Sequence, residues 1–595
     1  MPPKAPPFLT LRKTLAGLAV GATLLTGCSV AGADSSSTVV TSTSSSSSST
    51  SSSSSSASST TGASTTSAST TSVSNTSATA GASAATVLAD NQESHASAAD
   101  ETYSESDVVS ITLDGDTASA TGDGVTIDGS TVTITAAGTY KLSGTLAGQV
   151  VVNSAADGVV RLILDGATIT SSSGPAIFVA AADEAFIILA DGSTNSVTDA
   201  ASSTDDATAA VDSKADLTIT GDGSLSVTGT VNDGIASSDG LVIESGTISV
   251  KAADDGIRGQ DYVIVTGGTI TVDSQGDAVK SDNETDADRG YISVTGGIIT
   301  ATAGGDGLVA TTDVVVNGGS VDVTTGGGSG SQVAEDASAK GLKAGVNLVV
   351  SKGEVTVDAA DDSLHGDGQI TIDGGTLSLK SADDGVHAEQ SITIAGGSTT
   401  VEQSYEGIEA PQITISGGTN KITTSDDGIN ASGDGETGVT VSGGTTELLV
   451  GGDGLDANSG AMTMTGGTVM VSGPTQGGNG SLDLDNGLTI NGGTLLAAGT
   501  SSMAQSPSSE SSQGWVMASA TGSSGDVVTL KSGDTEIATY TAQSDFGTVW
   551  FSTSEITSGE SYDVYVNDTL VTTVTANTAS ASEMGGGGGM GGGRR

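Results

Sequence analysis

Apolar residues recur along the middle of the chain at a nearly constant interval, usually two positions after an acidic residue. The stretch Asp254-Asp255-Gly256-Ile257 shows the pattern, with Ile257 as its apolar anchor. Most successive anchors are 21 or 22 residues apart, and the longer intervals contain insertions. A fixed period of this length predicts a solenoid. The anchors are Ile235, Ile257, Val279, Leu308, Leu342, Leu364, Val386, Ile408, Ile429, Leu455 and Leu482.

Each repeat also contains short runs with the period-two alternation of β-strands. Residues 262–265 and 269–272 are two such runs, and the pair Gly267-Gly268 separates them. Similar glycine pairs recur in step with the anchors, as expected where corners need positive φ angles. Three strands and three corners in each repeat predict one coil of an all-β fold, the parallel β-helix. Eleven coils stacked at about 4.8 Å make a rod roughly 50 Å long.

Composition divides the rest of the chain. Residues 107–500 carry the strand patterns and form the predicted β-helix, whereas residues 515–576 read as a small β module with both tryptophans. A Ser-rich linker, 501–514, joins them, and the Gly-rich tail 577–595 is expected to be flexible. Residues 29–106 have almost no apolar content, so they cannot bury enough surface to fold and should form a disordered tether.

The first 28 residues have the organisation of an export signal. Arg12-Lys13 is a short basic region, residues 15–25 are apolar, and Leu25-Thr26-Gly27-Cys28 follows. This ending resembles a bacterial lipobox, which would make Cys28 the lipid-bearing first residue of the mature protein. The alternative is an ordinary secretory signal with an incidental cysteine. We expect a protein on the extracellular side of the bacterial cell membrane, anchored to that membrane through Cys28.

The charge balance narrows the range of partners. Seventy acidic residues face 18 lysines and arginines, which gives a formal net charge of −52. A field of this sign excludes nucleic acid and anionic membrane surfaces as partners and favours the gathering of cations. The single cysteine rules out a disulfide within the chain. We expect a monomer.

The acidic residues before the anchors should stack into a ladder, because equivalent positions of successive coils lie above one another. Neighbouring carboxylates about 5 Å apart repel by roughly 1 kcal/mol in water and by about 3 at an effective dielectric of 20. Two explanations remain open: each Asp caps its own turn through backbone N–H groups, or Ca²⁺ binds between carboxylates. The calcium candidates are Asp254, Asp255, Asp362, Asp384 and Asp427, where acids are doubled, and an acidic insertion at 282–288.

One position after the anchors, basic and ionisable residues fall into a single column. Its members include Arg258, Lys280, Lys343, His365 and His387. If these side chains point outward, they form a groove for an anionic chain such as a polysaccharide of uronic acids. The alternative is charge balance, in which they neutralise the neighbouring acid ladder.

Several motifs resemble a family of secreted bacterial β-helix proteins that contain a carbohydrate-binding domain and are related in fold to pectate lyases. The resemblance covers about residues 107–576. It rests on residues 138–144 with 159–169, on Asn232-Asp233-Gly234-Ile235 and Asp254-Asp255-Gly256-Ile257, and on residues 277–284 followed by Gly290-Tyr291-Ile292. The family implies a right-handed parallel β-helix, binding to cellulose and pectin-like acidic sugars, and Ca²⁺ at turn carboxylates. The positions carried over are Asp255, Asp277, Asp282, Asn283 and Glu284.

These observations favour a polysaccharide-binding protein that is not an enzyme, with Ca²⁺ as its cofactor. Aromatic rings are scarce in the regular coils, where only Tyr262, Tyr291 and Tyr405 occur, so we expect recognition by charge rather than by stacking. One alternative is a calcium-dependent lyase of uronic-acid polymers, with Lys280 as its base. A second alternative is a structural stalk or adhesin.

Overall fold

The computed structural model of the chain describes residues 81–97, 102–155, 157–200, 209–334, 337–433, 435–475 and 477–578. The predicted signal peptide, Cys28, most of the predicted tether and the tail from residue 579 lie outside the described residues. No helix within the described ranges has the length and apolar character needed to span a membrane.

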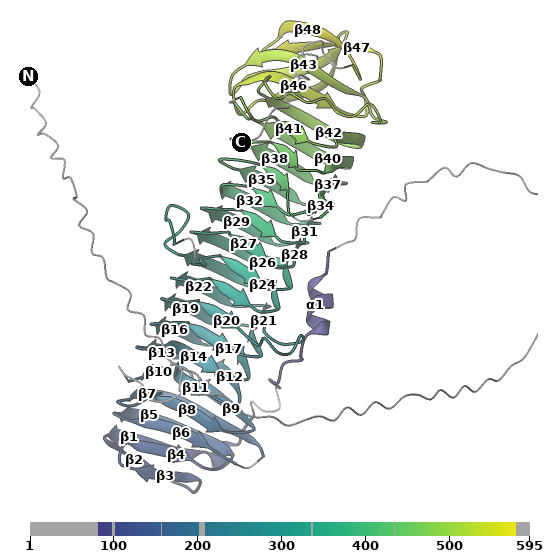
Figure 1. Ribbon diagram of the computed structural model, residues 1–595. Helices are drawn as coiled ribbons and strands as arrows, with labels where there is room; N and C mark the ends of the chain where they lie inside the picture. Colours follow the sequence, from purple (N-terminus) through teal and green to yellow (C-terminus); the bar gives the residue numbers. More distant parts are fainter. Residues whose placement is uncertain are drawn as a thin grey trace, which may run out of the picture. The chain divides into compact units, whose positions relative to one another are not determined.

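The described chain forms a parallel β-solenoid, as the repeat predicts (Figure 1). The anchor residues lie on its first face, a 16-stranded sheet that is parallel except for the initial β3–β4 hairpin. Its strands are β3 (Val125–Asp128), β4 (Thr131–Ile134), β6 (Gln149–Asn153), β8 (Ile177–Ala181), β11 (Ala209–Ser213), β14 (Asp233–Ser237), β17 (Ile257–Gly259), β20 (Val279–Ser281), β23 (Leu308–Ala310), β25 (Leu342–Ala344), β27 (Leu364–Gly366), β30 (Val386–Ala388), β33 (Ile408–Glu409), β36 (Ile429–Ala431), β39 (Leu455–Ala457) and β41 (Leu482–Leu484).

The second and third strands of each coil form the other two faces. In some coils these two strands are continuous, as in β24 (Asp313–Thr325) and β26 (Asn347–Ala359), so both faces belong to one 28-stranded sheet. Its strands are β1 (Val109–Gly115), β2 (Thr117–Ala120), β5 (Gly138–Leu146), β7 (Val159–Thr170), β9 (Glu184–Leu189), β10 (Thr194–Thr198), β12 (Asp216–Gly221), β13 (Ser224–Gly229), β15 (Gly240–Ile243), β16 (Thr247–Ala252), β18 (Tyr262–Val265), β19 (Thr269–Ser274), β21 (Tyr291–Val294), β22 (Ile298–Ala303), β24 (Asp313–Thr325), β26 (Asn347–Ala359), β28 (Gln369–Ile372), β29 (Thr376–Ser381), β31 (Ser391–Ile394), β32 (Ser398–Gln403), β34 (Gln412–Ile415), β35 (Thr419–Thr423), β37 (Gly438–Val441), β38 (Thr445–Leu449), β40 (Ala461–Ser472), β42 (Leu488–Gly499), β43 (Trp515–Gly522) and β46 (Phe546–Ser552).

A single core of small aliphatic side chains runs through the coils. The anchors stack in register, so that Ile235 pairs with Ile257 and Ile257 pairs with Val279, and all three are buried. On the third face, strands such as β16 and β19 alternate strictly between exposed and buried positions. Because every inward residue contacts its equivalents in the coils above and below, the narrow interior fills without large aromatic residues.

Corner glycines let successive coils approach closely. Gly397 has a φ of +76°, and a Cβ atom there would lie 2.6 Å from the carbonyl oxygen of Gly374 in the adjacent coil. Positive φ and this backbone contact both exclude larger residues. The glycine pairs therefore set the distance between coils at this corner.

The prediction that residues 29–106 form a disordered tether is wrong for residues 81–97, which we call the strap. The strap contains α1 (Ala84–Asp90), which lies alongside the solenoid (Figure 1). Its Ala84 and Val87 are buried against Val315 of β24 and Val349 of β26. Its composition resembles that of the Ser-rich tether, but these apolar contacts hold it on the solenoid. A short 3-10 turn, η1 (Glu105–Asp107), precedes β1.

The C-terminal module continues the solenoid rather than following a free linker. β46 pairs antiparallel with β42 of the last coil, and β43 pairs with β46. The remaining strands form a four-stranded sheet of β44 (Val527–Ser532), β45 (Thr535–Thr541), β47 (Ser561–Val566) and β48 (Thr569–Thr575). The predicted linker, 501–514, is bonded to the last coil, for example through Ser508 N–H to the Leu488 carbonyl. This arrangement covers the last coil, as solenoid ends require.

Candidate functional site

The basic column predicted from the repeat exists on the 16-stranded face. Arg258 pairs in register with Lys280, and Lys343 pairs with His365, which in turn pairs with His387. The imidazole rings of His365 and His387 lie with their centroids 5.1 Å apart. The spacing of the anchors therefore located these side chains correctly relative to one another.

The acid ladder runs beside this column, but its carboxylates do not cap their own turns. The backbone N–H of Asp277 donates to Oδ1 of Asp255 at 2.8 Å, and the N–H of Asp306 donates to Oδ1 of Asp277 at 2.8 Å. The N–H of Asp384 donates to Oδ1 of Asp362 at 3.0 Å in the same way. Each of these carboxylates thus binds the equivalent residue of the next coil, which corrects the expected turn cap and links coils to one another.

Side chains of the basic column neutralise the outer oxygens of the ladder. Lys280 Nζ lies 2.9 Å from Oδ2 of Asp277 and 3.1 Å from Oδ2 of Asp255. His365 Nδ1 lies 2.8 Å from Oδ2 of Asp362, and His387 Nδ1 lies 2.9 Å from Oδ2 of Asp384. These contacts favour charge balance over an open, positively charged groove.

The protonation of two column partners follows from these contacts. Burial acts to raise the pKa of Asp362, but hydrogen bonds from His365 and Lys340 hold it well below its usual range. Burial acts against the imidazolium of His387, yet its hydrogen bond to Asp384 and the charges of Asp362, Asp384 and Glu409 raise the pKa of His387 to about 9. The imidazole of His387 is therefore charged at neutral pH.

The acidic insertion is also held by protein contacts. Nε and Nη2 of Arg258 both lie 2.8 Å from Oδ2 of Asp282. Asn283 donates from Nδ2 to Asp261 at 2.7 Å, and its Oδ1 accepts the backbone N–H of Thr285 at 2.9 Å. Glu284 is exposed. Asn283 therefore builds the turn of the insertion.

The ladder changes character toward the C-terminal coils, where the neighbouring column is acidic. Oxygens of Asp427, Asp453 and Asp456 converge within 4.8 Å of one another, and no basic side chain pairs with them in the described part of the chain. Burial, with the charges of Asp453, Asp426 and Asp456, raises the pKa of Asp427 to about 7. Burial, with Asp453 and Asp483, raises the pKa of Asp456 to about 6. This cluster, which we call the acidic triad, lacks a counter-ion from the protein.

The donor sets differ in how well they fit a calcium ion. At Asp255, Asp277, Asp362 and Asp384, the protein already supplies a lysine or histidine that Ca²⁺ would have to displace. Beside the acidic triad, Asn430 is buried and its Oδ1 has no hydrogen-bond partner. Carboxylate and amide oxygens are the ligands that Ca²⁺ uses. Of the predicted positions, Asp427 therefore fits the ion best.

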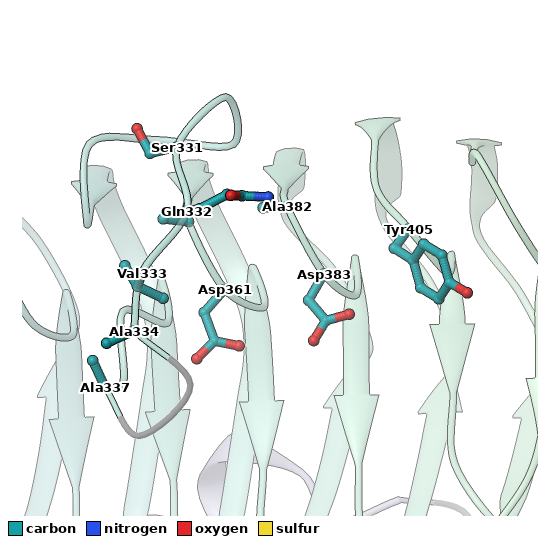
Figure 2. Close-up of a pocket in the computed structure, with 10 residues that line it drawn as sticks. Ser331, Gln332, Val333, Ala334, Ala337, Asp361, Ala382, Asp383 and Tyr405 are labelled. Carbon is teal, nitrogen blue, oxygen red and sulfur yellow. The ribbon is translucent and has the colours of Figure 1, made fainter. Parts of the chain in front are cut away.

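A groove lies beside the ladder, where residues 331–334 and Ala337 face the coils (Figure 2). They belong to the second long insertion of the repeat, which lies between the anchors Leu308 and Leu342. It has a volume of about 520 Å³, and Asp361, Asp383 and Tyr405 occupy successive coils along it. Tyr405 is 48% exposed, and a hydrogen bond to Asp426 raises its pKa to about 12. A second hollow of about 450 Å³ continues past Tyr405 along Glu402 and Gln403.

The sequence contained a signal for this groove that residue types alone did not reveal. Asp361, Asp383, Tyr405 and Asp426 hold the same position of successive repeats, and Tyr405 is the aromatic exception among acids. Insertions in solenoids often lie on the binding face, and residues of the second insertion line the groove. An aromatic residue at a turn position next to an insertion was therefore the available clue.

The comparisons agree with the resemblance seen in the sequence. Residues 128–385 match the model of a family described as carbohydrate-binding domain-containing protein. A protein with this description from Acetivibrio thermocellus is 35% identical over 150 residues, which are 24% of this chain and 52% of that protein. The chain thus matches about half the length of this relative.

A solved structure is also similar in sequence. It is described as the polysaccharide lyase-like protein from C. thermocellum, as a gadolinium derivative, and is 34% identical, with a TM-score of 0.36. The match covers 37% of this chain and 92% of that one. Over residues 128–385, which include Arg258, Lys280 and Asp361, the chain resembles the bacterial proteins that contain a carbohydrate-binding domain.

Proposed function

We propose that the protein binds polysaccharide at the bacterial cell surface, in the groove beside Tyr405. The observation that carries this proposal is the exposed ring of Tyr405 between two hollows, with Asp361 and Asp383 in line with it. A ring of this kind stacks on the flat face of a sugar, and carboxylates accept hydrogen bonds from sugar hydroxyls. The matched family description supports the same ligand class.

The charges of the groove favour a neutral chain over an acidic one. The groove presents the carboxylates of Asp361 and Asp383, and Lys340 Nζ is already engaged by Asp361 at 2.9 Å. A uronate would meet like charge here, whereas a cellulosic chain would not. An acidic polysaccharide would therefore need Ca²⁺ as a bridge.

The test is retention on cellulose and on polygalacturonate, for the wild type and for Tyr405→Ala. Loss of one stacked ring should weaken binding about tenfold, which corresponds to the upper part of the 0.5–1.5 kcal/mol range of aromatic contacts. Tyr103→Ala, which removes another exposed ring far from the groove in sequence, should bind like the wild type. Binding by Tyr405→Ala equal to that of the wild type would refute the groove as the binding site. If the wild type retains neither polysaccharide, the function as a structural stalk is favoured instead.

Calcium is proposed at the acidic triad, with Asp427, Asp453 and Asp456 as carboxylate ligands and Asn430 Oδ1 as an available amide oxygen. A bound Ca²⁺ would neutralise repulsion between carboxylates that the protein leaves without a counter-ion. The ion would act there as a structural charge and as a bridge to acidic sugars.

We propose no catalysis. The lyase alternative requires Lys280 as a neutral base, but bonds to Asp277 and Asp255 outweigh burial and raise the pKa of Lys280 above its ordinary value. A lysine held as a cation is a poor general base. Polygalacturonate with Ca²⁺ should therefore develop no new ultraviolet absorbance, and a signal lost in Lys280→Ala would establish the lyase.

Surface attachment is proposed through lipid on Cys28. Fatty-acid labelling of the wild type and of Cys28→Ser tests it, because Cys28 is the single cysteine of the chain. Label and membrane association should both disappear in Cys28→Ser. A membrane-free but exported wild type would instead support the ordinary secretory signal.

A further inference from the structure

An outward-facing column on the second face is largely apolar beneath the middle of the strap, with Ser293 between its apolar members. Val242, Ile264, Val315 and Val349 belong to this column, and the strap contacts these residues through its own apolar side chains. Farther along, the same column continues as threonines. Thr371 and Thr393 are buried against Gly81 at the start of the strap, whereas Thr414, Thr440 and Thr463 are partly exposed. The sequence of the coils is therefore adapted to a covering segment over a limited length.

Beside this column lies a pair of tyrosine rings from adjacent coils. Tyr262 and Tyr291 pair in register, and their ring centroids lie 5.4 Å apart. Gly240 occupies the position equivalent to Tyr262 in the preceding coil, and a Cβ atom there would collide with the Tyr262 ring. Both tyrosines point away from the main core, yet Tyr262 is 0% and Tyr291 is 3% exposed because the strap covers them.

The strap meets these rings with the contacts that a bound ligand would make. The ring of His95 stacks on Tyr262 with a centroid distance of 5.8 Å, and its backbone N–H donates to Tyr262 Oη at 2.9 Å. Tyr291 Oη donates to the carbonyl of Gln92 at 2.7 Å. Asn91 Nδ2 donates to Oδ2 of Asp313 at 2.9 Å, next to the rings.

The column that contains Tyr262 and Tyr291 continues beyond the strap with polar side chains. After Asp313 the register runs through Asn347, Gln369, Ser391 and Gln412, of which Gln369 and Gln412 are exposed. Coils repeat every 4.8 Å or so, close to the length of one pyranose unit. A sugar chain lying along the stack could therefore meet one ring or one polar side chain per coil.

We propose that the strap is a displaceable cover over a second polysaccharide-binding surface, formed by Tyr262, Tyr291 and the polar column that follows them. The ligand is an extended neutral polysaccharide, because the polar column that follows the rings carries amides, one hydroxyl and one carboxylate and no basic residue. It shares the ligand class of the proposed function but uses a different site.

The strap is built to open locally. Its helix has seven residues, too few to be stable alone, and only Ala84 and Val87 are its fully buried apolar side chains. A segment closed in about nine of ten molecules would weaken the apparent affinity of the covered surface about tenfold. Sugar bound first at the exposed Gln369 and Gln412 would compete with the strap for the rings.

The test uses Val87→Asp in the full chain to open the strap, with Ala85→Asp as its control. Ala85 lies on the exposed side of the same helix, so this variant gains the same charge without losing a buried contact. Hydrogen exchange of residues 81–97 reports opening, and calorimetry with cellohexaose reports binding. A double variant, Asn91→Ala with His95→Ala, removes the polar contacts instead.

We expect fast exchange in the strap of Val87→Asp and cellohexaose affinity about tenfold above that of the wild type. Adding Tyr262→Ala or Tyr291→Ala to Val87→Asp should return the affinity to the wild-type value. An opened strap with unchanged affinity would overturn the proposal, as would a strap that stays protected in both opening variants. Dimerisation of Val87→Asp without tighter sugar binding would assign the face to a second copy instead.

Repeating the measurements with Tyr405→Ala separates the two sites. If the groove proposal fails, the wild type shows no dependence on Tyr405, but Val87→Asp still gains affinity. If the strap proposal fails, the wild type loses affinity with Tyr405→Ala, but Val87→Asp gains nothing. Each failure therefore has its own signature.

Discussion

At the scale of single residues, the acid ladder is stabilised by two kinds of contact. One carboxylate oxygen accepts the backbone N–H of the next coil, and the other meets a basic side chain three residues further along, as in Asp277 with Lys280. Repulsion between stacked carboxylates is thereby offset in the coils that carry the basic column. The column is needed for the fold before any ligand is considered.

Lys280→Ala should destabilise the protein because it leaves Asp255 and Asp277 without their cation. The expected loss in the free energy of unfolding is about 1–3 kcal/mol, typical of partly buried charged groups that lose a partner. Lys251→Ala is the control, since Lys251 and Asp273 are 70% and 52% exposed and their pair should contribute under about 1 kcal/mol. Denaturant unfolding measures both, and equal losses would contradict the distinction.

Asp427→Asn tests the calcium proposal. In calcium-free buffer at pH 8, removing one charge from the acidic triad should raise the Tm relative to the wild type, because Asp427 is repelled by its neighbours. Added Ca²⁺ should stabilise the wild type by about 2.7 kcal/mol at 100 times its Kd, and the variant far less.

The control for this prediction is Asp373→Asn, which changes an exposed carboxylate outside the ladder. It should keep the full response to Ca²⁺. The calcium proposal at the acidic triad would be refuted if added Ca²⁺ left the Tm of the wild type unchanged. It would also be refuted if Ca²⁺ raised the Tm of Asp427→Asn as much as that of the wild type.

The sequence predicted which residues stack but not which atoms they bind. The 22-residue spacing places Lys343, His365 and His387 in one column, and the register confirms it. The Asp362 carboxylate could accept a backbone N–H of its own turn or one of the next coil. Which of these it accepts depends on its side-chain torsions, which the distance between coils determines. That distance arises only when coils pack on one another, so the local sequence cannot encode it.

At the scale of elements, the corners set the stacking, and glycine is required there for two separable reasons. Gly397→Ala should be destabilising because it combines a positive φ with a backbone contact at 2.6 Å. Gly166→Ala shares the positive φ, +75°, but a Cβ atom there meets nothing within 4 Å. The strain of φ alone costs about 1–2 kcal/mol, so Gly397→Ala should cost clearly more than Gly166→Ala in denaturant unfolding. Equal costs would mean that the coils separate without penalty.

The strap shows why some elements escape prediction from sequence. Residues 81–97 share the composition of the residues before them, and two apolar positions, Val87 and Leu88, form no periodic pattern. Their partners, Val315 and Val349, lie more than 200 residues away and are visible only as apolar exceptions in an outward column. The β-helix repeats itself and could be predicted, whereas the strap occurs once.

At the scale of the whole molecule, the ladder makes stability depend on pH. Burial and neighbouring acids raise the pKa of Asp233 to about 7 and of Glu406 to about 8, so the folded state holds protons that the unfolded state has released. Stability from these groups falls as pH rises from about 4 to about 8. The raised pKa of His387, about 9, contributes stability that is complete below its ordinary value of 6.5 and is lost as pH rises through 9.

In calcium-free buffer, the Tm should therefore decrease steadily from pH 5 to pH 9. His387→Gln should flatten the decrease between pH 7 and 9 and leave the part below pH 6 nearly unchanged. Thermal melting at fixed ionic strength measures both effects. A Tm that rises over this range would show that the carboxylates of the ladder are ionised in the folded state at pH 5.

The strap also determines how the molecule responds to mechanical load. Gly81 lies against Thr371 and Thr393, so the strap begins on the flank of the solenoid, several coils away from β1. A pull applied at Gly81 should act on α1 first and peel it from Val349 and Val315, while the hydrogen bonds between coils should stay unloaded. The stack would be spared at low force, and the tyrosine pair would be uncovered only after the helix had come away.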